Sequence, residues 1–124
     1  MSLEQFSAHQ TKRSKYRNEK TVSGDIKFDS KKECLRYHEL KLMERAGLIS
    51  DVKRQVPFVL APSVKFSESK RAKPALRLVV DFTYMKDGEL ILEDVKSEAT
   101  ITDTFIVKRH ILLANFGLHI KVYL

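Results

Sequence analysis

An Asp-Gly pair between two apolar, β-prone segments constrains the fold of this chain more than any other feature. The first segment, Leu76 to Tyr84, is rich in Leu, Val, Phe, Thr and Tyr, and the second runs from Glu89 to Lys96. Asp87-Gly88 lies between them and is a strong signal for a two-residue hairpin turn. The sequence therefore predicts an antiparallel hairpin over residues 76–96.

This turn also predicts a register that gathers charged side chains. With Asp87-Gly88 as the loop, Asp81 lies directly opposite Asp94, with Cβ atoms about 5 Å apart. Lys96 is two residues beyond Asp94 and therefore points to the same face. A three-residue loop would instead put Glu93 opposite Asp81 and turn Asp94 away. The Asp-x-Lys spacing favours the first register, because only that register brings the three side chains together.

Two carboxylates directly opposite each other destabilise a hairpin, and a bound divalent cation is the simplest compensation. Aspartate oxygens suit Mg²⁺, which binds a few carboxylates and keeps several waters. The hairpin therefore predicts a metal site at Asp81 and Asp94. The alternative is a surface hairpin whose charges are solvated, because short motifs have a high false-positive rate.

The composition narrows the class of protein. A chain of 124 residues is most simply one domain, and its 23 Lys and Arg against 16 Asp and Glu give a net charge of +7. This balance favours a polyanionic partner such as nucleic acid, although a basic protein without such a partner remains the alternative. The single cysteine, Cys34, excludes an intrachain disulfide and a cysteine-based zinc site.

No apolar run approaches the about 20 residues that span a membrane, and the N-terminus lacks the apolar centre of a signal peptide. We therefore expect a cytoplasmic chain. Residues 1–20 are polar and basic, and we expect a flexible arm that contacts phosphates, with Arg17 as one candidate. A disordered solubilising tail is the alternative. Residues 21–124 form the predicted domain.

A short strand or hairpin is expected over Thr21 to Phe28, followed by a helix. Ser30 and Glu33 form a capping box at its start, and the helix runs to about Ala46, with Gly47 as its C′ residue. Glu33 borders the apolar face and could lean toward a site on the sheet, or it could be a capping partner only. The expected buried face consists of Leu35, Leu42, Met43 and Ala46.

The remaining pattern predicts a strand over Ile49 to Leu60, in which Pro57 indicates an edge or a bulge. A polar, basic loop follows from Pro62 to Pro74, beside the carboxylates. After the hairpin come a second helix over Thr104 to Asn115 and a final strand over Leu118 to Leu124. The second helix should be largely buried through Phe105, Ile106, Ile111, Leu112 and Leu113. Candidate contacts to a phosphate backbone are Lys65, Lys70, Arg71, Lys73, Lys108 and Arg109. The order α-β-β-β-α-β predicts an α/β layered domain.

A helix glutamate, a strand aspartate, an Asp-x-Lys strand and a following basic helix resemble the PD-(D/E)XK nuclease superfamily. The phrases GDIKFDSKKE, VVDFTY and LEDVKS look most like small phage-encoded endonucleases, which are similar to the Holliday-junction resolvases of the phage endonuclease I type. The resemblance covers roughly residues 15–124. Val80 stands where the superfamily name has proline, and Asp94 stands where many members have glutamate.

This resemblance implies a restriction-endonuclease-like core, a mixed sheet flanked by helices, and a metal-dependent DNA endonuclease that hydrolyses phosphodiester bonds. Glu33 would be the helix carboxylate, Asp81 and Asp94 the strand carboxylates, and Lys96 the motif lysine that orients the attacking water. Asp81 and Asp94 would hold Mg²⁺ or Mn²⁺, with Glu33 and the backbone carbonyl of Val95 as further ligands.

The DNA structure that such a nuclease cuts is left open by these motifs. A junction resolvase must cut two opposing strands, which implies a symmetric homodimer. Candidate interface residues are Val22, Ile26, Phe28 and the terminal strand. One alternative is a transposase-subunit-like or restriction-type endonuclease that acts on duplex DNA. The others are a non-catalytic DNA-binding module with the nuclease fold, and an interaction protein whose basic face meets acidic proteins.

Overall fold

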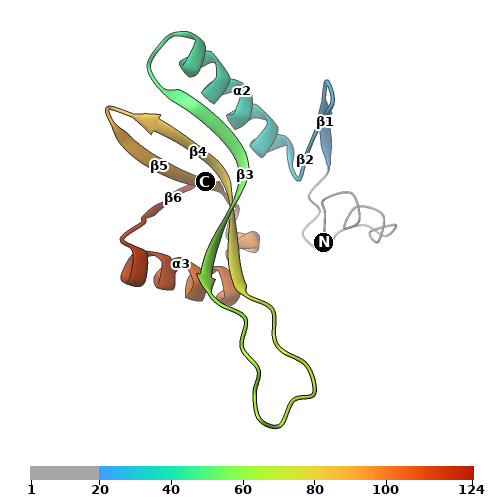
Figure 1. Ribbon diagram of the computed structural model, residues 1–124. Helices are drawn as coiled ribbons and strands as arrows, with labels where there is room; N and C mark the ends of the chain where they lie inside the picture. Colours follow the sequence, from blue (N-terminus) through green and yellow to red (C-terminus); the bar gives the residue numbers. More distant parts are fainter. Residues whose placement is uncertain (1–19) are drawn as a thin grey trace.

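A mixed β-sheet lies between two helices in the computed structural model, which describes residues 20–124 (Figure 1). The elements are β1 (Thr21–Ser23), β2 (Ile26–Phe28), α2 (Lys31–Arg45), β3 (Ser50–Ala61), β4 (Leu76–Lys86), β5 (Glu89–Val95), the 3₁₀ turn η1 (Glu98–Thr100), α3 (Asp103–Phe116) and β6 (Ile120–Tyr123). The predicted α/β order is confirmed, and the expected N-terminal hairpin precedes it. The basic arm, with Arg17, lies outside the described residues except for Lys20.

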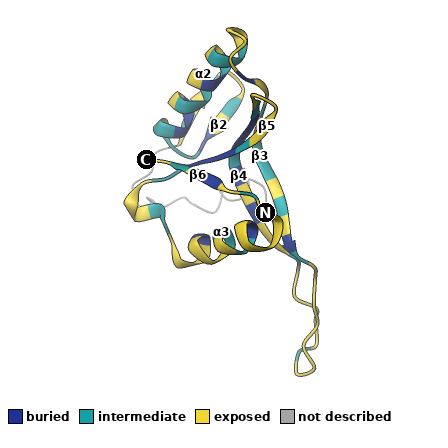
Figure 2. Cartoon of the chain, turned by 90° about the vertical axis from the view of Figure 1, so that its left-hand side faces the viewer, coloured by how far each residue is buried: buried dark blue, intermediate teal, exposed yellow. Residues whose placement is uncertain are grey.

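The four-stranded sheet has the order β3-β4-β5-β6. Strands β3, β4 and β5 pair antiparallel, whereas β6 pairs parallel with β5 after the crossover through α3. The two long helices lie on opposite sides of these strands (Figures 1 and 2). No helix within residues 20–124 is long and apolar enough to cross a membrane.

The β4–β5 hairpin has the register that the two-residue turn predicts. Lys86 pairs with Glu89, and Phe82 pairs with Glu93. Asp87 and Gly88 have φ angles of 52° and 79°, as a type I′ turn requires at both central positions. The two-residue register is therefore confirmed, and the three-residue alternative is excluded.

Strand β4 contributes to two separate apolar clusters. Leu78 and Val80 pack in the cluster that includes Phe105 and Leu112 of α3. Phe82 and Tyr84 pack in the other cluster, on the side of α2. Asp81 lies between Val80 of the first cluster and Phe82 of the second. The polar site described below therefore lies where the first cluster ends and the second begins.

The Ser30 N-cap and the Gly47 C′ residue of α2 follow the sequence prediction, but the predicted capping box is only half formed. The Ser30 side chain accepts a hydrogen bond from the Glu33 backbone N–H at 3.1 Å, and Gly47 has a φ angle of 80° just after the C-cap residue Ala46. The Glu33 side chain accepts from the backbone N–H of Asp29 at 3.3 Å, one residue before the N-cap. These local contacts fix the start of α2 and the direction of Glu33.

The predicted apolar face of α2 is wrong. Leu35 and Leu42 are 62% and 61% exposed, and Ala46 is exposed as well. The stripe through Glu33, Tyr37 and Leu40 faces the sheet instead, and Met43 packs against the same cluster. The helix takes this orientation because its polar residues find partners on the strands, which a count of apolar residues does not detect.

The second helix, α3, is also less buried than predicted. Thr102 caps it by accepting from the Phe105 backbone N–H at 3.2 Å, but only Phe105 and Leu112 are buried. Ile106 and Leu113 are 52% and 48% exposed. The i, i+7 spacing of the two buried residues shows that one narrow stripe of α3 contacts the sheet.

Strand β3 is at the edge of the sheet, as Pro57 predicted, and its register shifts between Ser50 and Lys53 and again near Ala61. Phe28, expected at a dimer interface, is 1% exposed and packs in the core, so it cannot serve there; Val22 is 62% exposed.

Candidate functional site

Asp81 and Asp94 face each other where β4 and β5 separate. The backbone N–H of Asp81 donates to Asp94 Oδ1 at 2.9 Å. The backbone N–H of Val95 donates to Asp81 Oδ2, also at 2.9 Å. Each strand therefore holds the carboxylate of the other, and both aspartates are fixed by main-chain donors.

Lys96 joins this pair, as its spacing predicted. Its Nζ lies 3.2 Å from Asp94 Oδ2 and 4.4 Å from the centroid of the Phe105 ring. A lysine over an aromatic face is attracted by the ring quadrupole, so α3 helps to position the ammonium beside the carboxylate.

Glu33 reaches the site through Gln55, a residue that the sequence did not single out. The Gln55 Nε2 atom donates to Glu33 Oε1 and to Asp81 Oδ1, each at 3.1 Å. Gln55 has a φ angle of 52°, which costs a non-glycine residue about 1–3 kcal/mol. The two hydrogen bonds help to hold this backbone geometry, and they connect the helix carboxylate with the strand carboxylate.

Arg54, the neighbour of Gln55, lies on the other side of Glu33. Its Nη2 is 3.5 Å from Glu33 Oε1, and its guanidinium stacks 4.4 Å from the centroid of the Phe28 ring. No pattern in the sequence connected Arg54 or Gln55 with Glu33, because their contacts span 21 and 22 residues of sequence separation.

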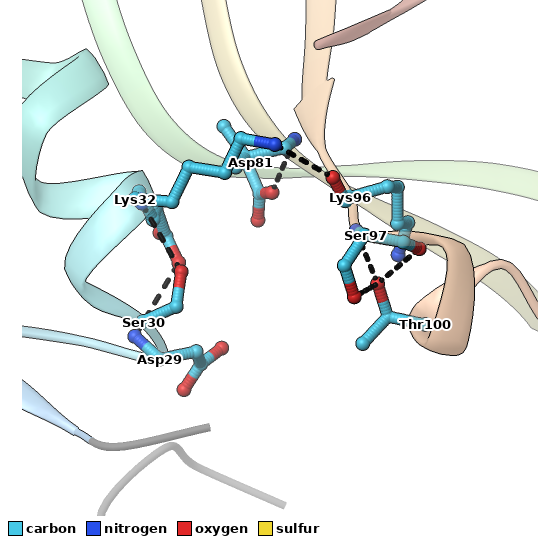
Figure 3. A pocket seen from close by; sticks show the side chains of 9 residues that line it. Asp29, Ser30, Lys32, Asp81, Lys96, Ser97 and Thr100 are labelled. Carbon is cyan, nitrogen blue, oxygen red and sulfur yellow. Dashed lines mark hydrogen bonds between the residues drawn. The ribbon is translucent and has the colours of Figure 1, made fainter. Parts of the chain in front are cut away.

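These side chains border a hollow of about 220 Å³ between the start of α2 and the turn η1 (Figure 3). Lys32 reaches across it and donates from Nζ to the backbone carbonyl of Lys96 at 3.2 Å. The lining residues are Asp29, Ser30, Lys32, Glu33, Asp81, Val95, Lys96, Ser97 and Thr100. The predicted catalytic residues Glu33, Asp81 and Lys96 therefore line one small cavity. Asp94 contacts two of these residues, because it accepts a hydrogen bond from the Asp81 backbone N–H and forms a salt bridge with Lys96.

The site gathers carboxyl groups away from water. Burial, followed by the Asp94 and Glu33 carboxylates, raises the pKa of Asp81 to about 8. Burial and the nearby Asp29 carboxylate also raise the pKa of Glu33. Carboxylates that disfavour each other's charge are the environment in which an added cation is stabilising.

The donor set fits a hard divalent cation, because carboxylate oxygens are the ligands that Mg²⁺ and Mn²⁺ prefer. Among residues 20–124, no three His, Cys, Asp or Glu side chains are gathered closely enough to hold an ion in the present arrangement. The Gln55 amide instead bridges Glu33 and Asp81 with its partial positive charge. Val95 lines the hollow, and its backbone N–H donates to Asp81.

The stability of the metal-free protein should fall as pH rises from about 4 to about 8. The folded state retains a proton on Asp81, with a pKa of about 8, which the unfolded chain loses near 3.8. The Asp81→Asn variant should lose most of this slope, because it has no carboxyl to titrate. Thermal melts of both proteins in chelator at pH 5 and pH 8 measure the difference. A wild-type slope equal to that of Asp81→Asn contradicts the expectation.

The basic loop does not lie beside the carboxylates, so that expectation is wrong. None of its four cations, Lys65, Lys70, Arg71 and Lys73, lines the hollow. Asp81 is five residues along β4 from Leu76, where the loop ends, which is about 17 Å at the rise of a strand. Lys108 lies at the base of this loop, and Arg109 donates from Nη2 to the Ile120 carbonyl at 3.3 Å.

Another buried acidic residue, Glu93, lies next to Asp94 but belongs to a structural network. The Arg36 guanidinium binds both of its carboxylate oxygens, with Nη2 2.9 Å from Oε2, and the Tyr84 hydroxyl donates to Oε2 at 2.8 Å. Burial and the Glu93 hydrogen bond raise the pKa of Tyr84 to about 12. This network fastens α2 to β5 directly beside the candidate site.

The fold and this site define a protein class: a small α/β protein with a facing pair of aspartates and a lysine where two central strands separate. A family model described as "Protein of unknown function (DUF1064)" matches residues 13–122, and the chain belongs to this family. No curated protein matches the chain, and no solved structure does.

Proposed function

We propose that the protein is a metal-dependent DNA endonuclease of the PD-(D/E)XK kind, which hydrolyses phosphodiester bonds at the Asp81–Asp94–Lys96 cluster. The observation that carries this proposal is the facing pair of aspartates, Asp94 buried and Asp81 half-buried, with the lysine ammonium 3.2 Å from Asp94, beside a hollow that is also lined by Glu33. The net charge of +7 supports a polyanionic substrate.

Each residue has a role that follows from its position. Asp81 and Asp94 would hold Mg²⁺ or Mn²⁺, and Glu33 would add a carboxylate from the opposite wall of the hollow. The bound cation would supply an acidified water and charge compensation for the phosphate. Lys96 would orient the attacking water and add positive charge close to the phosphate oxygens. Gln55 is a positioning residue, since it acts through Glu33 and Asp81.

We further propose that the protein prefers branched DNA, and this preference rests on the resemblance to junction-resolving endonucleases. Paired cuts on a four-way junction need two copies of the cluster, so a symmetric homodimer belongs to the same proposal. A phage origin and action in the host cytoplasm rest on this resemblance alone.

A cleavage assay on four-way junctions, flaps and plain duplex, in Mg²⁺ and in chelator, tests the proposal. We expect cutting in Mg²⁺ only, with branched DNA preferred. Equal cutting of plain duplex would favour the restriction-type alternative. DNA binding without cutting in Mg²⁺ or Mn²⁺ would select a non-catalytic DNA-binding module, and absence of DNA affinity at low salt would select a protein-interaction role.

Replacing Lys70, Arg71 and Lys73 together with Gln should weaken the salt dependence of DNA binding. Each lost phosphate contact reduces the slope of log K against log salt by about 0.9 on duplex DNA, so three contacts reduce it by about 2.7. A variant with Lys53, Lys86 and Lys121 replaced is the control, since it changes the net charge equally at exposed positions elsewhere. Equal slopes for the two variants would mean that the loop does not contact the backbone.

A further inference from the structure

The segment between β3 and β4 is an ordered ribbon that projects from the sheet (Figures 1 and 2). Val64 and Lys73 exchange two backbone hydrogen bonds, with N···O distances of 3.2 and 2.6 Å. At the far end, the Ser69 N–H donates to the Phe66 carbonyl at 3.0 Å and closes a turn. We call residues 62–75 the ribbon.

The ribbon and its base carry almost only positive charge. Residues 62–77 contain one acidic residue, Glu68, and five basic ones: Lys65, Lys70, Arg71, Lys73 and Arg77. In the part of the chain from Lys20 onward, none of these five cations forms a salt bridge. Exposed cations that outnumber the acidic residues around them favour a polyanionic partner over a protein with a mixed surface.

The ribbon and its base also expose apolar side chains, which a purely phosphate-binding loop does not need. Phe66 is 50% exposed, and Val64 and Leu76 are 46% and 48% exposed. These three line a groove of about 610 Å³ together with Lys73, Arg77 and Lys108. This volume lies within the range of small-ligand sites. The lining of the groove therefore combines apolar side chains, including an aromatic ring, with three basic ones.

This combination matches an unpaired nucleotide. In plain duplex DNA the π-faces of the bases are covered by stacking, and only the phosphates, sugars and base edges are accessible, whereas an unpaired base offers a free π-face for stacking on an aromatic side chain. We propose that the groove binds an unpaired nucleotide of a DNA strand, with the base against Phe66 and its phosphates along Lys73, Arg77 and Lys108.

The inference rests on the proposed function for its substrate class and adds where an unpaired region would bind. The base of the ribbon lies about 17 Å along β4 from Asp81. That span corresponds to about five nucleotides at 3.4 Å per nucleotide of one strand. Phe66 lies beyond this point, toward the far end of the ribbon, so the unpaired nucleotide would lie at least about five nucleotides from the cut.

Equilibrium binding of the full chain to labelled DNA in chelator tests the groove without any cutting. The Phe66→Ala variant should weaken binding to single-stranded DNA and to a fork with unpaired arms by about 5- to 150-fold, the range for loss of one base–aromatic stack. Binding to blunt duplex should stay within about twofold, because its bases are already stacked. The Phe66→Trp variant should bind unpaired DNA at least as tightly as wild type.

Phe116→Ala is the matched control, because Phe116 is also 50% exposed but lies at the end of α3. It should leave all affinities unchanged. If Phe66→Ala alters the circular dichroism spectrum, Phe66→Leu replaces it, since leucine keeps the apolar bulk and loses the aromatic face. Equal losses on duplex and unpaired DNA, or no loss on either, would overturn the groove as a nucleotide site.

The proposed nuclease activity and the proposed nucleotide-binding groove can each be disproved without affecting the other. Mg²⁺-dependent cutting without any selective effect of Phe66→Ala would remove the groove and leave the nuclease. A selective loss of unpaired DNA binding, in a protein that cuts no DNA in Mg²⁺ or Mn²⁺, would support the groove and remove the nuclease.

Discussion

Asp81→Asn and Asp94→Asn are each expected to lower the rate of Mg²⁺-dependent DNA cleavage by about 1,000-fold or more, the upper range for losing one preorganised electrostatic group. Asparagine keeps the size of aspartate but removes one of two closely spaced negative charges that would hold the cation. DNA affinity should stay within about twofold, because phosphate contacts and not these buried groups position the backbone. Single-turnover cleavage and equilibrium binding on one labelled substrate measure the two effects.

Asp87→Asn is the matched control, since Asp87 is an exposed carboxylate in the turn of the same hairpin. It should cut like wild type. Lys96→Ala should lose cleavage as the aspartate variants do, whereas Lys86→Ala should not, because Lys86 is exposed near the turn. Wild-type cleavage by any of the three site variants would remove that residue from the catalytic site.

Arg36→Ala should lower the free energy of unfolding by about 3–5 kcal/mol, the cost of leaving one partner of a buried ion pair without compensation. The Glu93 side chain is 2% exposed, and Arg36 contacts both of its oxygens. In a domain of this size, the loss corresponds to a fall in melting temperature of about 10 °C or more. Urea unfolding followed by circular dichroism gives the free energy.

Arg45→Ala on the same helix is the control, because Arg45 is exposed in the last turn of α2. Its effect should be small, as is usual for surface substitutions. The Arg36→Met, Glu93→Leu double variant should recover much of the loss, because replacing both charges leaves no ion buried alone. An Arg36→Ala loss no larger than that of Arg45→Ala would show that Glu93 is effectively solvated.

Short motifs in the sequence are sufficient to predict the central hairpin and the N-caps of the two helices. The Asp87-Gly88 turn fixes the register over the whole strand pair, so the meeting of Asp81 and Asp94 follows from two residues at the turn. Ser30 and Thr102 act through backbone groups three residues away, and a short window of sequence contains that information.

Local sequence motifs do not predict which residues bind the buried polar groups. Gln55 meets Glu33 and Asp81 only because β3 folds back along β4, and Arg36 meets Glu93 across 57 residues of sequence. These contacts also turn α2 so that Leu35 is exposed, against the apolar pattern. The orientation of that helix is decided by tertiary contacts that residue type alone does not encode.

A crystal structure of the Lys96→Ala variant with branched DNA and Mn²⁺ tests whether Asp81 and Asp94 hold the catalytic cation, because Mn²⁺ is located by its anomalous scattering. We expect an ion bound by carboxylate oxygens of both Asp81 and Asp94, at about 2.0–2.6 Å, with a DNA phosphate oxygen on the same ion. DNA bound on another face, or no ion between the two aspartates, would contradict this expectation.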